Sequence, residues 1–206
     1  ALDTTLRSIN KDGTFRPLLN SKAEVENIAK LFQNKKRNSK VDILLKNDAN
    51  EQKLKEALSK RYRFVHLATH SFSDLKTPEL SGIACIPTES IEEENGILFS
   101  GEVYNMSINS DLLVLSSCES GVGQLLDGEG MLGLNRSFVY AGVPNVVFSL
   151  WKVFDHVTKD MMSQFYKYIL DGHSYSSALQ LVKLDMLRNG ATASPEFWGA
   201  FLLIGR

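Results

Sequence analysis

One apolar run that ends in a short reactive sequence constrains the fold of this chain more than any other feature. Residues Leu112 to Gly121 read Leu-Leu-Val-Leu-Ser-Ser-Cys-Glu-Ser-Gly, so an apolar segment stops at Cys118, an acid and a glycine. Such a run is typical of a central strand in a parallel sheet, although a run this short also fits a buried helix. In open α/β sheets, chemistry lies outside the carboxyl ends of the strands. Cys118 is therefore the first candidate nucleophile.

A second run has the same form. Phe64 to His70 reads Phe-Val-His-Leu-Ala-Thr-His and also ends an apolar segment in a reactive side chain. If the two runs are neighbouring parallel strands, His70 and Cys118 leave the same edge of the sheet. An imidazole in that place exchanges the protons that a thiolate attack and a departing amine require. The two residues thus form a candidate Cys/His dyad.

Length and composition fit one α/β domain. The chain has 206 residues, and 43% of them are hydrophobic, which is enough to fill the core of a single domain. No apolar stretch approaches the roughly 18 residues of a membrane span, and the first residues lack a secretory apolar region. We therefore expect a soluble cytoplasmic protein. A start at Ala1 indicates a processed chain or a piece of a longer one.

The two cysteines favour a reducing compartment. They are too few for a disulfide framework, and their spacing is not that of a zinc knuckle. Cys85 lies in the short apolar segment Gly82–Pro87, where a thiol is usually a small buried hydrophobe. We expect it to be structural.

Charge is unevenly distributed along the chain. Residues 1–63 carry 15 Lys and Arg against 8 Asp and Glu, whereas residues 64–206 carry 8 against 16. An acidic field around the candidate dyad favours a cationic substrate or partner, and solvated helix faces explain the same counts equally well. The run Lys35–Arg37 is too short to indicate nucleic-acid binding.

Periodicity and turn residues predict alternating helices and strands. Strands are expected at residues 41–45, 64–70, 82–87, 96–99, 112–115, 144–151 and 197–204. Helices are expected at residues 22–32, 51–58, 101–106, 130–140, 155–170 and 174–188. Ser21 and Glu24 have the spacing of a capping box. The predicted strand, helix and strand over residues 41–67 suggest a βαβ unit and therefore a parallel sheet. The stretch Ser71–Gly101 is expected to be mostly loop.

Neither a nucleotide nor a metal is indicated. The glycines between Gly121 and Gly130 lack the Gly-Lys-Ser/Thr of a phosphate loop. His66 and His70 lie on a predicted strand, and Leu67 stands where a metalloprotease helix carries Glu, so a zinc site has little support. We expect no cofactor and interpret His66 as a hydrogen-bonded core residue. His156 and His173 are expected at the surface.

Five motifs follow one another along the chain: His66–His70, Leu115–Gly121, Asp127–Gly130, Ser149–Asp155 and Phe197–Gly205. In this order they resemble the CHAT domain, a family of caspase-like cysteine peptidases related to separase, gingipain and the caspases. The resemblance extends from about residue 23 to residue 205 and implies a caspase-like three-layer α/β/α sandwich with a mostly parallel central sheet. It also implies a single domain over residues 1–206.

The resemblance assigns Cys118 as the nucleophile and His70 as the proton donor to the leaving amine. Caspase-like enzymes form the oxyanion hole from the backbone N–H groups of the nucleophile and of a glycine after the histidine. Ser71 occupies that glycine position here. A backbone donor survives, but a side chain crowds the approach and a positive φ becomes unfavourable.

Asp155 ends a Leu-Trp-x-Val-x-Asp stretch that resembles the separase segment lining the pocket for the residue before the cleaved bond. By that match, Asp155 selects Arg or Lys through a charge-assisted contact. A local alternative is an N-cap role for Asp155, because a helix is predicted to begin there.

The function implied is that of a cysteine endopeptidase that cleaves a protein substrate after Arg or Lys. The resemblance also implies latency until a regulatory partner or sensor domain, such as tetratricopeptide repeats, repositions the loops; no nucleic-acid or membrane partner is expected. Two alternatives remain: a catalytically silent caspase-like scaffold, and a thiol hydrolase or acyltransferase that acts on a small molecule.

Overall fold

A mostly parallel sheet organises the fold. The computed structural model describes residues 18–35, 39–74, 76–87, 96–116, 129–151 and 153–205. Within these ranges the central sheet has the order β1 (Phe64–Leu67), β5 (Leu112–Leu115), β6 (Val146–Ser149) and β7 (Phe201–Ile204). The first three strands run parallel, and β7 pairs with β6 in the antiparallel direction. The predicted sheet type is confirmed.

Burial on both faces explains the uninterrupted apolar sequences of β5 and β6. Every residue of these two strands is at most 1% exposed. Successive side chains of a strand point to opposite faces. Leu112 and Val114 accordingly pack in one core cluster, whereas Leu113 and Leu115 pack in the other.

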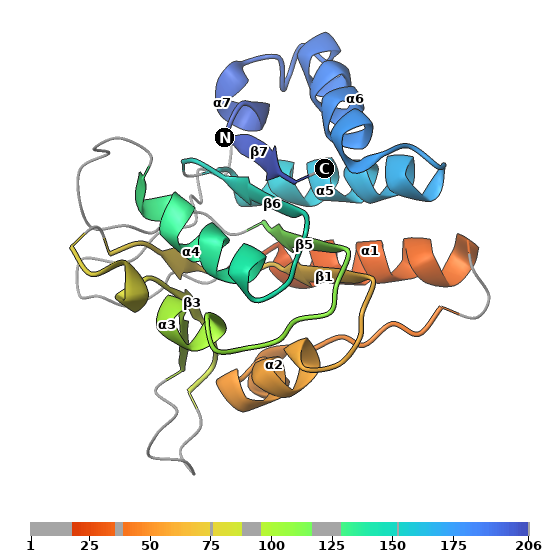
Figure 1. Ribbon diagram of the computed structural model, residues 1–206. Helices are drawn as coiled ribbons and strands as arrows, with labels where there is room; N and C mark the ends of the chain where they lie inside the picture. The colour runs from red at the N-terminus through yellow and green to blue at the C-terminus, as the bar shows by residue number, and fades with distance from the viewer. Residues whose placement is uncertain are drawn as a thin grey trace.

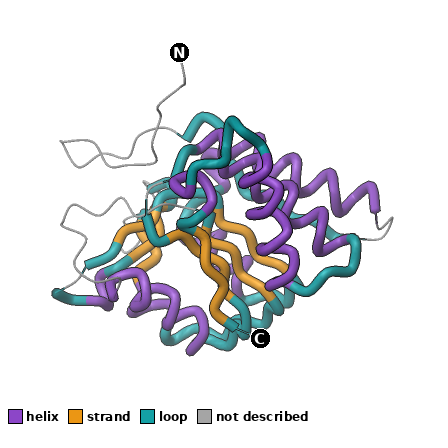
Figure 2. Tube along the Cα trace, turned by 90° about the horizontal axis from the view of Figure 1, so that it is seen from above, coloured by secondary structure: helices purple, strands orange, loops and turns teal. Residues whose placement is uncertain are grey.

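Helices cover both faces of the sheet and give a three-layer α/β/α sandwich (Figure 1, Figure 2). One layer holds α1 (Ser21–Lys35), α5 (Asp155–Leu170) and α6 (Tyr175–Arg188). The opposite layer holds α2 (Glu51–Leu58), α3 (Ser100–Val103) and α4 (Glu129–Tyr140). The short α7 (Pro195–Trp198) precedes β7. None of the described helices is both long enough and apolar enough to cross a membrane.

A second, smaller sheet follows β1, in the stretch expected to be mostly loop. It contains β2 (Ser71–Phe72), β3 (Gly82–Ala84) and β4 (Ile97–Phe99), all antiparallel, with the short 3-10 helix η2 (Pro78–Leu80) between β2 and β3. The strands predicted around residues 82–87 and 96–99 are confirmed as β3 and β4. Cys85 follows β3 directly and is only partly buried, so its surroundings are less enclosed than expected.

The predicted strand at Val41–Leu45 is wrong. This segment forms no ladder and leads into the 3-10 helix η1 (Lys46–Asp48). A strand requires a partner, and β5 is the one strand that pairs with β1 among the described residues. Asp42 and Ile43 are instead exposed. The parallel sheet is built by the unit β5–α4–β6 rather than by a unit that begins at residue 41.

The predicted capping box of α1 is replaced by a buried polar contact. The Glu24 N–H donates to the Asn20 carbonyl, so the helical hydrogen bonds begin at Asn20. The Glu24 side chain is fully buried, and its Oε1 lies 2.8 Å from His66 Nε2. His66 Nδ1 lies 3.3 Å from the Tyr166 hydroxyl, and burial together with the charge of Glu24 raises the pKa of that hydroxyl. The prediction of a hydrogen-bonded core His66 is confirmed, and the contact joins α1, β1 and α5.

We predict that Glu24→Ala lowers the free energy of unfolding by about 2–4 kcal/mol, because it leaves the buried imidazole without its carboxylate partner. The matched control is Glu26→Ala on the same helix, whose side chain is 38% exposed. The control should change stability by less than about 0.5 kcal/mol. Urea unfolding followed by circular dichroism measures both values, and equal midpoints for the two variants would contradict the prediction.

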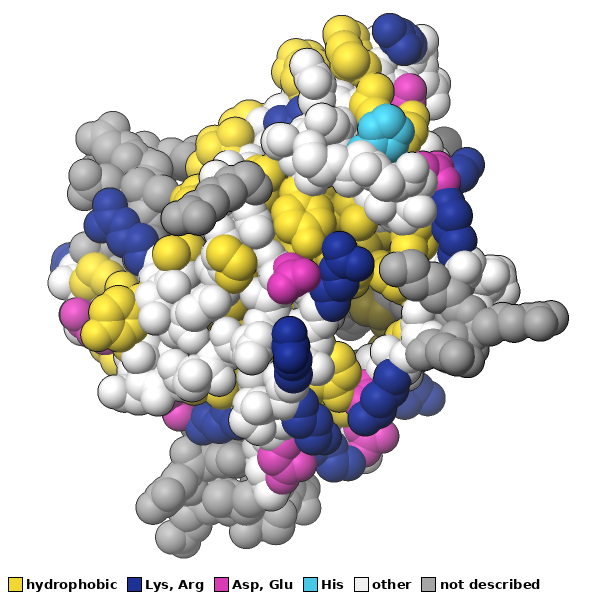
Figure 3. Space-filling model, turned by 45° about the vertical axis from the view of Figure 1, so that its right-hand side comes forward, with side chains coloured by type: hydrophobic (Ala, Val, Ile, Leu, Met, Phe, Trp, Pro, Cys, Tyr) yellow, Lys and Arg dark blue, Asp and Glu magenta, His cyan; other side chains and the backbone are white. Residues whose placement is uncertain are grey.

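Several described cations in the first third of the chain lie beside acidic side chains. On the face in Figure 3, Lys and Arg side chains lie in small groups beside Asp and Glu side chains. Lys55 Nζ contacts Glu51 and Glu102 at 2.6 and 2.7 Å, and Arg63 lies 3.3 Å from Asp111. This mixture supports the interpretation of the charge asymmetry as solvated surface.

Candidate active site

The candidate site residues follow the carboxyl ends of three adjacent parallel strands. In the chain, His70 and Ser71 come after β1, Cys118 comes after β5, and Asp155 opens the helix that follows β6. Because β1, β5 and β6 are neighbours in the sheet (Figure 1), these ends meet at one edge. This is the edge at which ligands and chemistry occur in open α/β sheets.

His70 is held in a fixed place at this edge. It is 5% exposed, and its backbone carbonyl accepts a hydrogen bond from the Ala84 N–H at 2.8 Å. The neighbouring Thr69 hydroxyl donates to the Ala84 carbonyl at 2.7 Å. The small sheet therefore anchors the backbone on which the imidazole is mounted.

Cys118 lies outside the described residues, which end at Ser116 and resume at Glu129. Up to that point β5 remains paired with β1, because the Ser116 N–H donates to the Leu67 carbonyl at 3.2 Å. In the register of the two strands, Phe64 pairs with Leu112 and Leu67 with Leu115. Each residue of β1 thus faces the residue 48 positions later, and His70 and Cys118 have the same separation in the sequence. The dyad itself stays a prediction.

Ser71 has a backbone conformation that a serine adopts without strain. It is fully buried in β2 and faces Ile83 of β3. The Ala84 N–H donates to the His70 carbonyl, and hydrogen-bonded pairs alternate along an antiparallel ladder. The Ser71 N–H and carbonyl therefore point away from β3. Lys46 is the one non-glycine residue of the described ranges with a positive φ, so the steric objection to serine at this position does not apply.

Asp155 is buried at the start of α5, with an exposed fraction of 2%. Phe154 occupies the N-cap position, so the N-cap interpretation of Asp155 is wrong. A carboxylate in the first helical turn is still favourable, because the N-terminal end of a helix carries partial positive charge.

Asn20 is a contact of Asp155 that the sequence did not indicate. Its backbone N–H donates to Asp155 Oδ2 at 2.6 Å, and its side-chain amide donates to the same oxygen at 3.0 Å. The two residues are 135 positions apart, so no local pattern links them. In the sequence, Asn20 is only a polar residue that precedes a predicted helix. The contact ties the start of α1 to the start of α5.

The histidines away from the dyad have other surroundings. His173 is exposed as expected, whereas His156 is partly buried. Among the residues that the structure describes, no three His, Cys, Asp or Glu side chains come together in a way that could hold a metal ion.

Comparison with known families identifies the chain. The sequence model of the CHAT domain matches residues 4–206. The chain belongs to the CHAT family. CHAT domains are related to caspase-like cysteine peptidases, and the mixed α/β architecture with its mostly parallel sheet is consistent with a caspase-like fold. The resemblance seen in the five sequence motifs is confirmed.

Two curated mammalian proteins share part of this CHAT sequence. Tetratricopeptide repeat protein 28 of Mus musculus is 28% identical over 109 residues, and its Homo sapiens counterpart is 29% identical over 109 residues. These matches cover 53% of this chain and 4% of each relative. The chain therefore spans a small fraction of the length of these relatives.

We predict that Asp155→Ala lowers the free energy of unfolding by about 1–3 kcal/mol, because both Asn20 donors lose their acceptor. Asp160→Ala, on the same helix with a side chain that is 76% exposed, is the control and should cost less than about 0.5 kcal/mol. Chemical denaturation compares the two variants. Indistinguishable stabilities would show that the buried contact with Asn20 contributes nothing.

Proposed function

We propose that this CHAT domain is a cysteine endopeptidase that uses Cys118 and His70 to cleave proteins after Arg or Lys. The observation that carries the proposal is the parallel register of β1 and β5, whose offset equals the separation of His70 and Cys118. Family membership supports a peptidase-related role. A buried histidine at a strand end, anchored by the small sheet, supports a role for His70 in the chemistry.

The proposed reaction is acyl transfer to sulfur. The Cys118 thiolate attacks the scissile carbonyl, the oxygen gains negative charge, and His70 donates a proton to the departing amine. Water then hydrolyses the thioester. Backbone N–H groups of Cys118 and Ser71 stabilise the oxyanion in this mechanism. The direction of the Ser71 N–H, away from β3, supports its part in the proposal.

Asp155 is the proposed determinant of the preference for Arg or Lys. Its carboxylate lies beside Asn20, which supplies two neutral N–H donors. A substrate guanidinium offers positively charged donors in their place, and its planar fork matches a carboxylate in a bidentate ion pair. Because Asp155 is almost fully buried, a substrate side chain reaches its carboxylate only if Asn20 moves away from it. This requirement is consistent with a latent enzyme.

A partner containing tetratricopeptide repeats is the proposed activator. The support is the similarity to two proteins named for such repeats, together with family membership. The proposal fails if the isolated chain cleaves peptides as fast as it does with each candidate repeat protein added.

We predict that Cys118→Ala abolishes cleavage of a proteome-derived peptide library, whereas Cys85→Ala leaves it unchanged. The two cysteines provide the matched pair, because only Cys118 follows the end of β5. Mass spectrometry of new peptide termini measures the cuts. Cuts that persist in Cys118→Ala, or that vanish in Cys85→Ala, would contradict the assignment of the nucleophile.

We predict that Asp155→Asn lowers kcat/KM for substrates with Arg before the cleaved bond by roughly 30-fold, corresponding to about 2 kcal/mol for a lost charge-assisted contact. The asparagine keeps a carbonyl oxygen for Asn20. Asp160→Asn serves as the control on the same helix and should leave kcat/KM unchanged. An unaltered Arg preference in Asp155→Asn, with Cys118-dependent cleavage intact, would assign Asp155 a structural role only.

A further inference from the structure

The strand β7 presents an open hydrogen-bonding edge. It is the last strand of the central sheet in the described part of the chain. The Leu150 N–H donates to the Ala200 carbonyl, and the register pairs Phe148 with Leu202 and Val147 with Leu203. Hydrogen-bonded pairs alternate along an antiparallel ladder, so the backbone of Leu202 faces β6 and that of Leu203 faces the open side.

The neighbouring carbonyl shows the same direction. Lys183 of α6 donates from its Nζ to the Phe201 carbonyl at 2.6 Å, which places that carbonyl on the side away from β6. The Leu203 N–H and carbonyl lie two residues further along the same edge. They therefore offer one donor and one acceptor to an additional strand.

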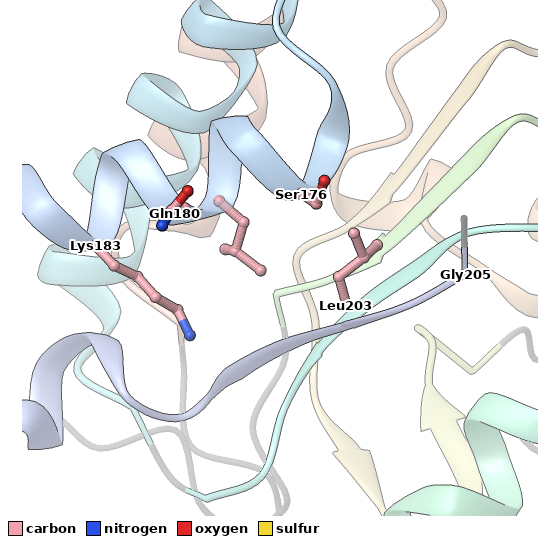
Figure 4. Close-up of a pocket in the computed structure, with 6 residues that line it drawn as sticks. Ser176, Gln180, Lys183, Leu203 and Gly205 are labelled. Carbon is pink, nitrogen blue, oxygen red and sulfur yellow. The ribbon is translucent and has the colours of Figure 1, made fainter.

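A hollow of ≈ 510 Å³ lies between α6 and this end of β7. Figure 4 shows Gln180 and Lys183 of α6 on one side of it and Leu203 and Gly205 of the β7 segment on the other. Leu203 is partly buried and packs against the core cluster on the α6 face of the sheet. A strand added beside Leu203 would direct every second side chain toward this hollow.

A second hollow lies on the opposite face of the same strand. Its volume is ≈ 460 Å³, and Ile204 of β7 lines it together with residues of α4 and with Tyr104. Val139 and Tyr140 of α4 are 41% and 76% exposed there, although both have large hydrophobic side chains. The intervening side chains of an added strand would point toward this second hollow.

Each hollow contains one cation and, among the described residues, no carboxylate paired with it. Lys183 is partly buried, and burial lowers the pKa of its ammonium group. Arg136 lines the second hollow and forms no ion pair with another described residue. Apolar surroundings with a single cation favour a ligand that combines apolar and acidic side chains.

We propose that the β7 edge binds an extended segment of a partner protein, which adds to the sheet through the Leu203 backbone. Successive side chains of the bound segment point in turn into the first and the second hollow, and the carboxylates of the segment pair with Lys183 and Arg136. Main-chain hydrogen bonds supply affinity and the alternate pockets supply specificity in this mode of recognition. A second copy of β7 fits less well, because Phe201–Ile204 carries no acid and would bring two Lys183 side chains together.

Selection from a phage-displayed library of random ten-residue peptides on the chain of residues 1–206 tests the proposal. The expected peptides alternate apolar residues and contain Asp or Glu. Leu203→Pro removes the N–H on the open edge and no hydrogen bond of the ladder, so it should abolish binding, and an unchanged far-UV circular dichroism spectrum should show that the loss of the partly buried leucine side chain leaves the fold intact. Titration calorimetry with a selected synthetic peptide should show at least about tenfold weaker binding to Lys183→Gln and Arg136→Gln. Lys167→Gln, an exposed change on α5, should bind as the native chain does.

Three results would overturn the proposal. The first is a library that yields no enriched peptide. The second is a selected peptide that binds Leu203→Pro or Lys183→Gln as tightly as the native chain. The third is concentration-dependent self-association in analytical ultracentrifugation that Leu203→Pro removes, because it would assign the edge to a second copy.

Discussion

Parallel pairing of β1 with β5, buried beneath helices on both faces, is the constraint on which the rest of the structure depends. Helices cover both faces of a parallel sheet, so side chains along its strands are not accessible to a substrate. Reactive side chains in such sheets therefore occur beyond the carboxyl ends of the strands. The same pairing fixes the offset between the segments that leave the two strands. The proposed pairing of His70 with Cys118 rests on this register, because the two residues are as far apart in the sequence as the paired residues of β1 and β5.

Polar contacts from α1 connect this sheet to its helical layer. Glu24 reaches His66 on β1, and Asn20, at the start of the same helix, reaches Asp155 on α5. The two carboxylates are buried and their partners are partly buried, which makes each contact costly to break. The position of α1 therefore bears on the core of the sheet and on the carboxylate proposed to select the substrate. A shift of α1 would loosen both contacts together and would free the Asp155 carboxylate from Asn20.

Much of the fold follows from local sequence, whereas the contacts around the candidate site do not. The strands β5 and β6 are predictable because continuous apolar runs suit burial on both faces, and α5 is predictable because its apolar residues recur at helical spacing. Val41–Leu45 failed as a strand because strand formation depends on a partner that the sequence does not name. Glu24 and His66 are 42 residues apart, and Asn20 and Asp155 are 135 apart, so only the packed chain brings them together.

The most direct test of the central claim is the pH dependence of Cys118 alkylation by iodoacetamide, measured in a Cys85→Ala background with and without His70→Ala. A protonated imidazole beside a thiol stabilises the thiolate, so Cys118 should titrate below the ordinary thiol pKa of about 8.5. His70→Ala should move that titration upward, whereas His173→Ala, at an exposed position, should leave it in place. Superimposable profiles with and without His70 would show that the two residues do not form a pair, and the proposed dyad would be wrong.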